Sequence, residues 1–228
     1  MRILAVDTAT EVCGLALFVN GQVMAERSIA QGVTHSKVLM EALSTLLQEA
    51  GLDMATLDGL AVTRGPGSFT GLRIGISTVK GLVLATGKPL VGVSTLAVLA
   101  HQAPGGTPWV CPMIDARRKE VYWSLYRRQG DNLLRMLPEQ AGSVVDAVNQ
   151  LGREPCLFIG NGAQLYAAVI GERLARTARL ADAGLHALQP GMVARLGAQR
   201  LAQGHRDDVR RFIPVYLRPS DAQVPTPR

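Results

Sequence analysis

Residues 65–71 are the segment of the sequence best suited to contact an anion. They read Gly-Pro-Gly-Ser-Phe-Thr-Gly and lie between an expected strand and an expected helix. Two glycines around a proline permit backbone angles that other residues resist, and Ser68 or Thr70 can accept hydrogen bonds from the first N–H groups of the helix. A helix start of this kind can hold an anion. The segment lacks the Gly-Lys-Ser/Thr ending of a Walker loop, because Leu72 and Arg73 follow it. Two interpretations stay open: a structural turn, or an anion site that uses Ser68 and Thr70.

Two aspartates, Asp7 and Asp115, each follow a short apolar stretch and begin a polar turn. The Asp7 turn resembles the first phosphate-contacting turn of the actin, sugar-kinase and Hsp70 superfamily, in which a glycine normally follows the acid. Here Ala9 and Thr10 stand at those positions, and Asp115 is followed by Ala-Arg. Both turns therefore disfavour a close approach of the backbone to a phosphate. Asp7 remains a candidate for cofactor binding, and we expect no tightly bound cofactor in the isolated chain.

The other reactive side chains show no catalytic or metal-binding pattern. No histidine pair stands at ligand spacing, no Cys-x-x-Cys occurs, and no serine sits in a Gly-x-Ser-x-Gly elbow. The residues concerned are His35, His101, His186, His205, Cys13, Cys111 and Cys156. We expect no catalytic residue and no metal site, with the cysteines as small core residues.

Hydrophobic periodicity predicts the elements that position these residues. Asn20-Gly21 is a strong hairpin signal, and Gly51 is a helix stop. Strands are expected at residues 2–6, 14–19, 22–29, 59–63, 90–93, 110–114, 120–127 and 156–159. Helices are expected at residues 35–50, 72–85 and 191–203.

The chain repeats its opening unit in its second half. Residues 110–127 again give a strand, an aspartate, a polar turn and a strand, which indicates a duplicated fold. The proline- and glycine-rich stretch at 103–108 marks a boundary between lobes. We expect an N-terminal lobe at 1–103, a C-terminal lobe at 104–189, a helix at about 190–204 packing back on the first lobe, and an irregular tail at 205–228.

Four segments together resemble the TsaB family, also called YeaZ. They are Val-Asp-Thr-Ala-Thr at 6–10, Arg-Gly-Pro-Gly-Ser-Phe-Thr-Gly-Leu-Arg-Ile-Gly at 64–75, Gly-Val-Ser-Thr-Leu at 92–96 and Ile-Asp-Ala-Arg at 114–117. The resemblance covers residues 1 to about 128 closely and the rest in outline. It implies an α/β protein with a two-lobe actin-like fold, in which a mixed β-sheet with helices is duplicated.

The resemblance also implies a function beside TsaD and TsaE, as a non-catalytic scaffold or activator of threonylcarbamoyl transfer to the tRNA adenosine next to the anticodon. TsaD binds its metal through a His-x-x-x-His pair after the equivalent Gly-Val, where this chain has Thr95 and Leu99. Leucine cannot ligate a metal and threonine is a poor donor, so ATP and metal are expected on the partner subunits.

Two other functions compete with the scaffold. An independent small-molecule kinase or acyltransferase of the same superfamily would need tight nucleotide binding between the lobes, which the glycine-poor acidic turns disfavour. A protease, suggested by the older family name glycoprotease, would need a metal pair or an activated nucleophile, and the sequence shows neither.

The expected helices at residues 35–50 and 72–85 carry more apolar and small residues than one core-facing stripe needs. Packing on the chain's own sheet is one interpretation; the resemblance favours an interface, because TsaB and TsaD are understood to pair through these helices. Without TsaD, the chain could form a homodimer. The predicted interface residues are Met40, Leu43, Leu47, Gly71, Gly75, Thr78 and Leu82.

Residues 115–228 hold the whole net charge of +6, since basic and acidic residues balance before them. The arginines near the end either follow a nucleic-acid backbone, such as tRNA, or form a solvated face. They are Arg195, Arg200, Arg206, Arg210, Arg211 and Arg218. No signal-peptide pattern and no apolar stretch of membrane-spanning length occurs, so we expect a cytoplasmic protein without membrane contact.

Overall fold

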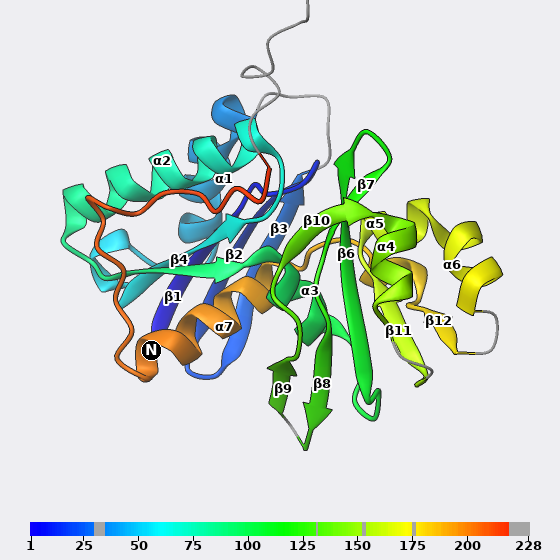
Figure 1. Cartoon of the computed structure of the whole chain (residues 1–228). Helices are drawn as coiled ribbons and strands as arrows, with labels where there is room; N and C mark the ends of the chain where they lie inside the picture. Colours follow the sequence, from blue (N-terminus) through cyan, green and yellow to red (C-terminus); the bar gives the residue numbers. More distant parts are fainter. Residues whose placement is uncertain (30–34, 131, 152–153, 175–176, 219–228) are drawn as a thin grey trace, which may run out of the picture.

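A computed structural model describes residues 1–29, 35–130, 132–151, 154–174 and 177–218 of the 228-residue chain. Its elements form two lobes that lie side by side, each built around one mixed β-sheet (Figure 1). The α/β class and the duplicated, actin-like arrangement predicted from the sequence are confirmed.

The first sheet has the strand order β3-β2-β1-β4-β5. The strand bounds are Arg2–Asp7 (β1), Cys13–Val19 (β2), Gln22–Ile29 (β3), Gly59–Gly65 (β4) and Leu90–Ser94 (β5). Strands β1, β2 and β3 pair antiparallel, whereas β1, β4 and β5 pair parallel. The predicted hairpin is confirmed, because Asn20 and Gly21 join β2 to β3 with φ angles of 49° and 94°.

The second sheet has the order β10-β7-β6-β11-β12, with β8 pairing to β6 and to β9. The bounds are Trp109–Arg117 (β6), Glu120–Trp123 (β7), Tyr126–Gln129 (β8), Asn132–Arg135 (β9), Gln140–Ser143 (β10), Cys156–Ile159 (β11) and Ala178–Leu180 (β12). The pairing of β6 with β7 is antiparallel and that of β6 with β11 and of β11 with β12 is parallel, as for β1, β2, β4 and β5 in the first lobe. The single strand expected at 120–127 is corrected. The strand is interrupted after Trp123, and β7 and β8 pair with different parts of β6.

Helices cover both faces of the first sheet. The helix bounds are His35–Glu49 (α1), Phe69–Thr86 (α2), Thr95–Gln102 (α3), Val144–Asn149 (α4), Asn161–Leu165 (α5), Ala167–Leu174 (α6) and Pro190–Ala202 (α7), with short 3-10 turns at Met54–Thr56 and Ala183–Leu185. Figure 1 shows α7 on one face of the first sheet and α1 with α2 on the other. Strand β1 is therefore apolar on both sides, with Ile3 and Ala5 packed towards α7 and Leu4 and Val6 packed towards α1 and α2.

Helices α3 and α7 join the two lobes. They share one hydrophobic core that includes Val98 and Leu99 of α3, Val193 of α7, Ala5 of the first sheet and Ile159 of the second. The lobe boundary predicted at residues 103 and 104 falls in the loop between α3 and β6. Across the described residues, no helix is long and apolar enough to cross a bilayer.

The segment from residue 205 to residue 218 has no helix or strand and packs along the first lobe. Asp207 donates its N–H to Leu90 O at 2.8 Å, and Val215 donates to Arg64 O at 2.8 Å. Phe212 lies in the core against the α2 side of the sheet. The irregular tail predicted from residue 205 is therefore not confined to the surface, because Phe212 is buried. Residues 219–228, with the last prolines, lie outside the described residues.

Candidate functional site

The Asp7 turn and the glycine-rich segment meet at one edge of the first sheet. Strands β1 and β4 are parallel neighbours, so their carboxyl ends lie together, and each is followed by one of the two segments. Ser68 donates its backbone N–H to Ala9 O at 2.7 Å. The two motifs singled out in the sequence therefore form one structural unit.

Three glycines allow this close packing. A Cβ atom would lie 2.3 Å from Ala9 O at Gly67, 2.0 Å from Thr8 O at Gly71 and 2.2 Å from Thr8 Oγ1 at Gly75. Real Cβ atoms do not approach other atoms so closely, so any side chain at these positions would push the turn away from α2. The glycines make room for the chain's own turn, which favours the structural interpretation of the motif over an anion site.

The polar atoms of the motif are also used within the chain. Ser68 is the N-cap of α2, and its Oγ accepts the N–H of Gly71 at 3.2 Å. Thr70 is exposed at the start of the helix. Asp7 is 1% exposed, and its Oδ1 accepts from Thr63 Oγ1 at 2.7 Å and from Ala9 N at 3.0 Å. The Asp7 carboxylate thus fixes the turn to the neighbouring strand.

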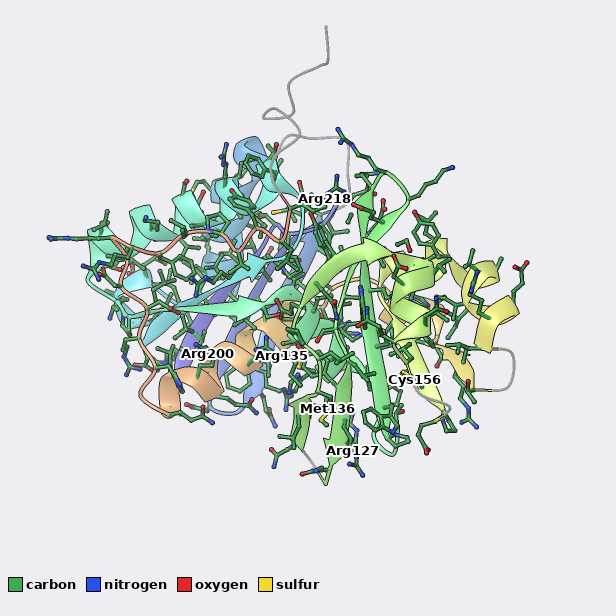
Figure 2. All side chains as sticks on the ribbon, in the orientation of Figure 1. Arg127, Arg135, Met136, Cys156, Arg200 and Arg218 are labelled. Atoms are coloured by element: carbon green, nitrogen blue, oxygen red, sulfur yellow. The ribbon has the colours of Figure 1, made fainter. Side chains whose placement is uncertain are left out.

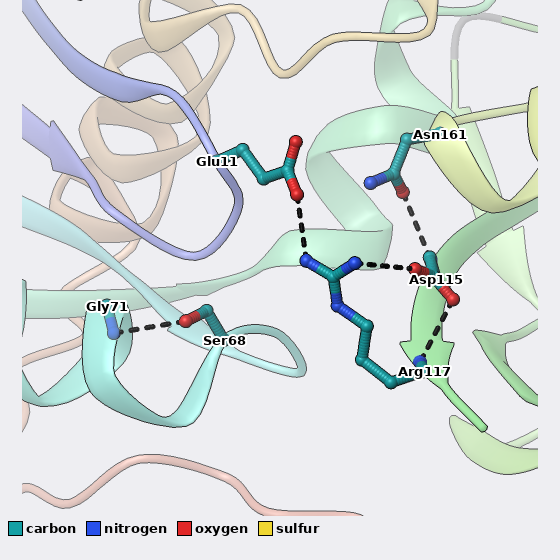
Figure 3. Close-up of polar contacts among 6 residues, drawn as sticks. All are labelled: Glu11, Ser68, Gly71, Asp115, Arg117 and Asn161. Atoms are coloured by element: carbon teal, nitrogen blue, oxygen red, sulfur yellow. Dashed lines mark hydrogen bonds and ion pairs between the residues drawn. The ribbon is translucent and has the colours of Figure 1, made fainter. Parts of the chain in front are cut away.

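The second acidic turn has a different construction. Arg117, Arg118 and Lys119 have φ angles of 63°, 54° and 63°, a left-handed conformation that costs energy in residues other than glycine. Asp115 Oδ1 accepts the N–H of Arg117 at 2.9 Å, and Asp115 donates its own N–H to Asn161 Oδ1 at 3.0 Å (Figure 3). The aspartate and Asn161 hold a basic turn in a strained conformation.

Arg117 connects the two turns across the lobes. Its guanidinium donates to Glu11 Oε1 at 2.8 Å and lies 3.6 Å from Asp115 Oδ2 (Figure 3). Both Arg117 and Glu11 are exposed, so water and salt screen the pair. The sequence had shown only a polar turn here, and neither Glu11 nor Asn161 carried a signal of its role.

The predicted interface residues divide into two groups. Met40 is exposed, and Thr78 and Leu82 are half-buried, so the partner-facing role of these three stays a prediction. Leu43 and Leu47 are only 3% and 6% exposed, because α1 packs against both β2 and α2, which cover its wide apolar stripe.

Gly71 and Gly75 are likewise buried, against Thr8 of the same chain. The expectation that Leu43, Leu47 and these two glycines face a partner is corrected, because residues of this chain cover them. Leu84 of α2, which periodicity did not single out, is more exposed than any other large apolar side chain in the described part of the chain.

His186 and the three cysteines, Cys13, Cys111 and Cys156, are buried in the core. His186 is buried and contacts Gly160 O at 3.0 Å and Ala181 O at 2.9 Å through its two ring nitrogens. Burial, reinforced by Asp7, raises the pKa of Cys13 to about 11, and burial raises that of Cys156 to about 12, so both thiols stay protonated and unreactive. In the described ranges, no three acidic, cysteine or histidine side chains come together as metal ligands would.

Thr95 and Leu99 lie four residues apart on α3, with both side chains in the core. A methyl carbon of Leu99 would touch a Cβ placed on Gly160, at 2.9 Å, which shows how tightly it packs against the turn after β11. The donor chemistry at these positions does not fit a metal ion, because leucine has no donor atom.

The geometry defines the class of protein: two actin-like lobes with a duplicated sheet, linked by α3 and α7, in which both acidic turns bond within the chain. A family model described as "TsaD: tRNA N6-adenosine threonylcarbamoyltransferase" matches residues 23–226. A crystal structure of a protein from Pseudomonas aeruginosa, described as similar to peptidase YEAZ, has a TM-score of 0.83 and 32% identity, over 95% of this chain and 99% of that one.

Two relatives carry the description "tRNA threonylcarbamoyladenosine biosynthesis protein TsaB". The Bacillus subtilis (strain 168) protein is 32% identical over 98% of this chain and 97% of its own length. The Escherichia coli (strain K12) protein is 34% identical over 96% of this chain and 95% of its own length. The chain belongs to the TsaB family.

Proposed function

We propose that this protein takes part in the formation of threonylcarbamoyladenosine on tRNA, as a non-catalytic subunit that pairs with TsaD and works with TsaE. The observation that carries the proposal is the identity of 32% and 34%, over nearly the whole chain, to two proteins named for this biosynthesis. The match to the TsaD family model supports a TsaD-like partner, because related subunits of one fold commonly pair through equivalent surfaces.

The non-catalytic role rests on the site. Asp7 and Asp115 both accept hydrogen bonds from their own turns, so a nucleotide would have to compete with the chain for these carboxylates. Thr95 and Leu99 are buried at the positions where the resemblance would put metal ligands. The ATP and the metal of the reaction are then supplied by the partner subunits.

The partner surface in this proposal is the exposed part of α1 and α2. Met40 of α1 is 50% exposed and Leu84 of α2 is 69% exposed, and α1 contacts α2. A contiguous exposed apolar patch marks an interaction surface, and the proposal is that Met40 and Leu84 contribute to one such patch across the two helices. Leu47, by contrast, is unsuitable for testing the interface because a charge there would disturb the core.

The test compares Met40→Glu with Met24→Glu, a matched control, because Met24 is 53% exposed on β3. In a reconstituted mixture of tRNA, an activated threonylcarbamoyl donor, ATP, TsaD and TsaE, we expect the chain to be required for threonylcarbamoyladenosine formation. Met40→Glu keeps its melting temperature and binds TsaD about 100-fold more weakly, since a charge is desolvated against an apolar surface. Met24→Glu binds normally. Full pairing by a stable Met40→Glu variant would contradict this surface, and modification without the chain would contradict the function.

The alternative, an independent kinase or acyltransferase, predicts a different result with the chain alone. It requires tight ATP binding between the lobes, which calorimetry on the purified protein measures directly. The internally bonded Asp7 and Asp115 favour the scaffold, for which ATP binding by the isolated chain is weak.

A further inference from the structure

A cleft of about 420 Å³ lies between the linking helices and the second lobe. Its walls come from α3 and α7 on one side and from the chain between β8 and β10 on the other. The charged residues in the lining are Arg135, Glu139 and Arg200, and the apolar part includes Leu133 and Leu196. Neither acidic turn contributes to this cleft, which is separate from the site described above.

The carboxylate of Glu139 already has two partners within the chain, Ser94 and Arg135. Its side chain is 10% exposed, accepts a short hydrogen bond from Ser94 Oγ, and lies 3.6 Å from the guanidinium of Arg135. Burial raises the pKa of Glu139, with Ser94 and Arg135 opposing that rise. Glu139 and Arg135 together contribute no net charge to the cleft when both are ionised.

Among the described residues, Arg200 is the charged group of this cleft that has no ion-pair partner. None of the ion pairs among the described residues includes it, and its buried Nε has no hydrogen-bond partner within the described part of the chain. A buried donor left without a partner costs free energy, and guanidinium groups bind carboxylates through two parallel hydrogen bonds. Arg135 of β9 and Arg200 of α7, both labelled in Figure 2, come from different lobes. Both line the cleft.

His101 adds no second positive charge at neutral pH. Burial lowers its pKa, and Arg128 acts in the same direction, although the contact of Nδ1 with Ala97 O at 2.8 Å opposes them. The cleft therefore has one surplus positive charge beside hydrogen-bonding groups from Gln199 and Gln203.

We propose that this cleft binds a small organic monocarboxylate bearing hydroxyl or amide groups, with Arg200 as the partner of its carboxylate. One surplus positive charge suits a monoanion, the glutamines suit its polar substituents, and Leu133 and Leu196 suit a short carbon skeleton. A volume of about 420 Å³ is within the usual range for small-molecule sites. Ligand binding here would hold the two lobes in one relative position, since the walls belong to both.

The experiment uses the purified chain alone, so its outcome is independent of TsaD, TsaE and tRNA. Gluconate and hippurate are titrated beside their neutral amides and beside inorganic phosphate, with calorimetry and with the ¹⁵N signal of the Arg200 Nε–H as readouts. We expect both acids to shift that signal and to bind at least about tenfold more tightly than their amides, the usual effect of a hydrogen bond to a charged group. We also expect phosphate to bind more weakly than the acids.

The variants assign the effect to Arg200. Arg200→Gln lowers the affinity for the acids about tenfold or more. Arg127→Gln is the matched control, because Arg127 lies on β8 over the ring of Trp109, 5.4 Å from its centroid, and outside the cleft lining. Equal binding of acids and amides, tighter binding of phosphate, or equal losses in both variants would overturn the proposal. If Arg200→Gln does not fold, the wild-type Nε–H signal decides: no shift with either acid rejects the site.

Discussion

The turns that follow β1 and β6 occupy equivalent places in the two lobes, but they differ in burial, packing and backbone conformation. In the first lobe Asp7 is buried, and the turn lies against three glycines on the other segment. In the second lobe the corresponding glycines, Gly160 and Gly162, lie against the end of β6 rather than against the turn. The turn itself has three consecutive basic residues in the left-handed conformation. One turn is held by its surroundings, whereas the other is held by Asp115 and Asn161 at its base.

This difference shows how the two copies of a duplicated unit can keep one shape with different packing. The first turn is part of the core, so its residues contribute chiefly to stability. The second is exposed and reaches the first only through the Arg117–Glu11 ion pair. Changes in the first turn should therefore cost much free energy of unfolding, and changes in the second should cost little or even stabilise the fold.

The largest effect is expected at Gly71. Gly71→Ala puts a Cβ atom 2.0 Å from Thr8 O, so either the turn or α2 must move, and the free energy of unfolding falls by about 3 kcal/mol. Gly81→Ala is the control on the same helix, because nothing lies within 4 Å of its Cβ position. That variant gains up to about 1 kcal/mol from helix propensity. Urea unfolding measures both, and equal effects would contradict the packing role of Gly71.

The two aspartates should differ next. Asp7→Ala leaves the buried hydroxyl of Thr63 without its acceptor, which costs about 2 kcal/mol. Asp115→Ala costs less than about 1 kcal/mol, because the backbone N–H and guanidinium that it loses belong to the exposed Arg117 and can bind water. Chemical denaturation of the two variants side by side tests this order; a larger loss for Asp115 would reverse the comparison.

Glycine should have opposite effects in the two turns. Lys119 has a φ angle of 63°, so Lys119→Gly relieves left-handed strain and raises stability by about 0.5–1 kcal/mol. Thr10→Gly in the first turn lowers stability by a similar amount, about 0.5–1 kcal/mol, because it only adds freedom to the unfolded chain. Thermal melts of the pair give the sign, and a stabilising Thr10→Gly would show that the first turn is also strained.

The smallest effect concerns the ion pair between the turns. Glu11→Gln removes an exposed pair with Arg117, whose side chains are 54% and 71% exposed. The loss should be below about 0.5 kcal/mol at low salt and should vanish near 1 M salt, where screening acts within about 3 Å. A salt-independent loss above about 2 kcal/mol would mean that this pair, rather than the α3 and α7 core, holds the lobes together.

Local chemistry explains which parts of the fold could be predicted. Asn20-Gly21 gave the hairpin and Gly51 the end of α1, because positive φ angles favour these residue types wherever they occur. Ser68 was one of two residues expected to cap α2, and its Oγ accepts an N–H only three residues ahead, although the helix begins at Phe69 rather than at the expected residue 72. The break between β7 and β8 was missed; Ser124, at the break, donates to Leu137 O, a partner that periodicity does not identify.

The sequence by itself determined the duplicated strand–aspartate–turn units, the family, and the absence of a donor at position 99, since these depend on residue types and short spacings. Only the tertiary structure decided what covers each apolar or small residue. Leu43, Leu47, Gly71 and Gly75 were expected to face a partner, yet α2, the sheet and the Asp7 turn cover them. Hydrophobicity predicts that a side chain leaves water, but long-range packing decides which residues become its neighbours. The same holds for Arg200, whose place in a cleft shared by two lobes follows from the tertiary structure.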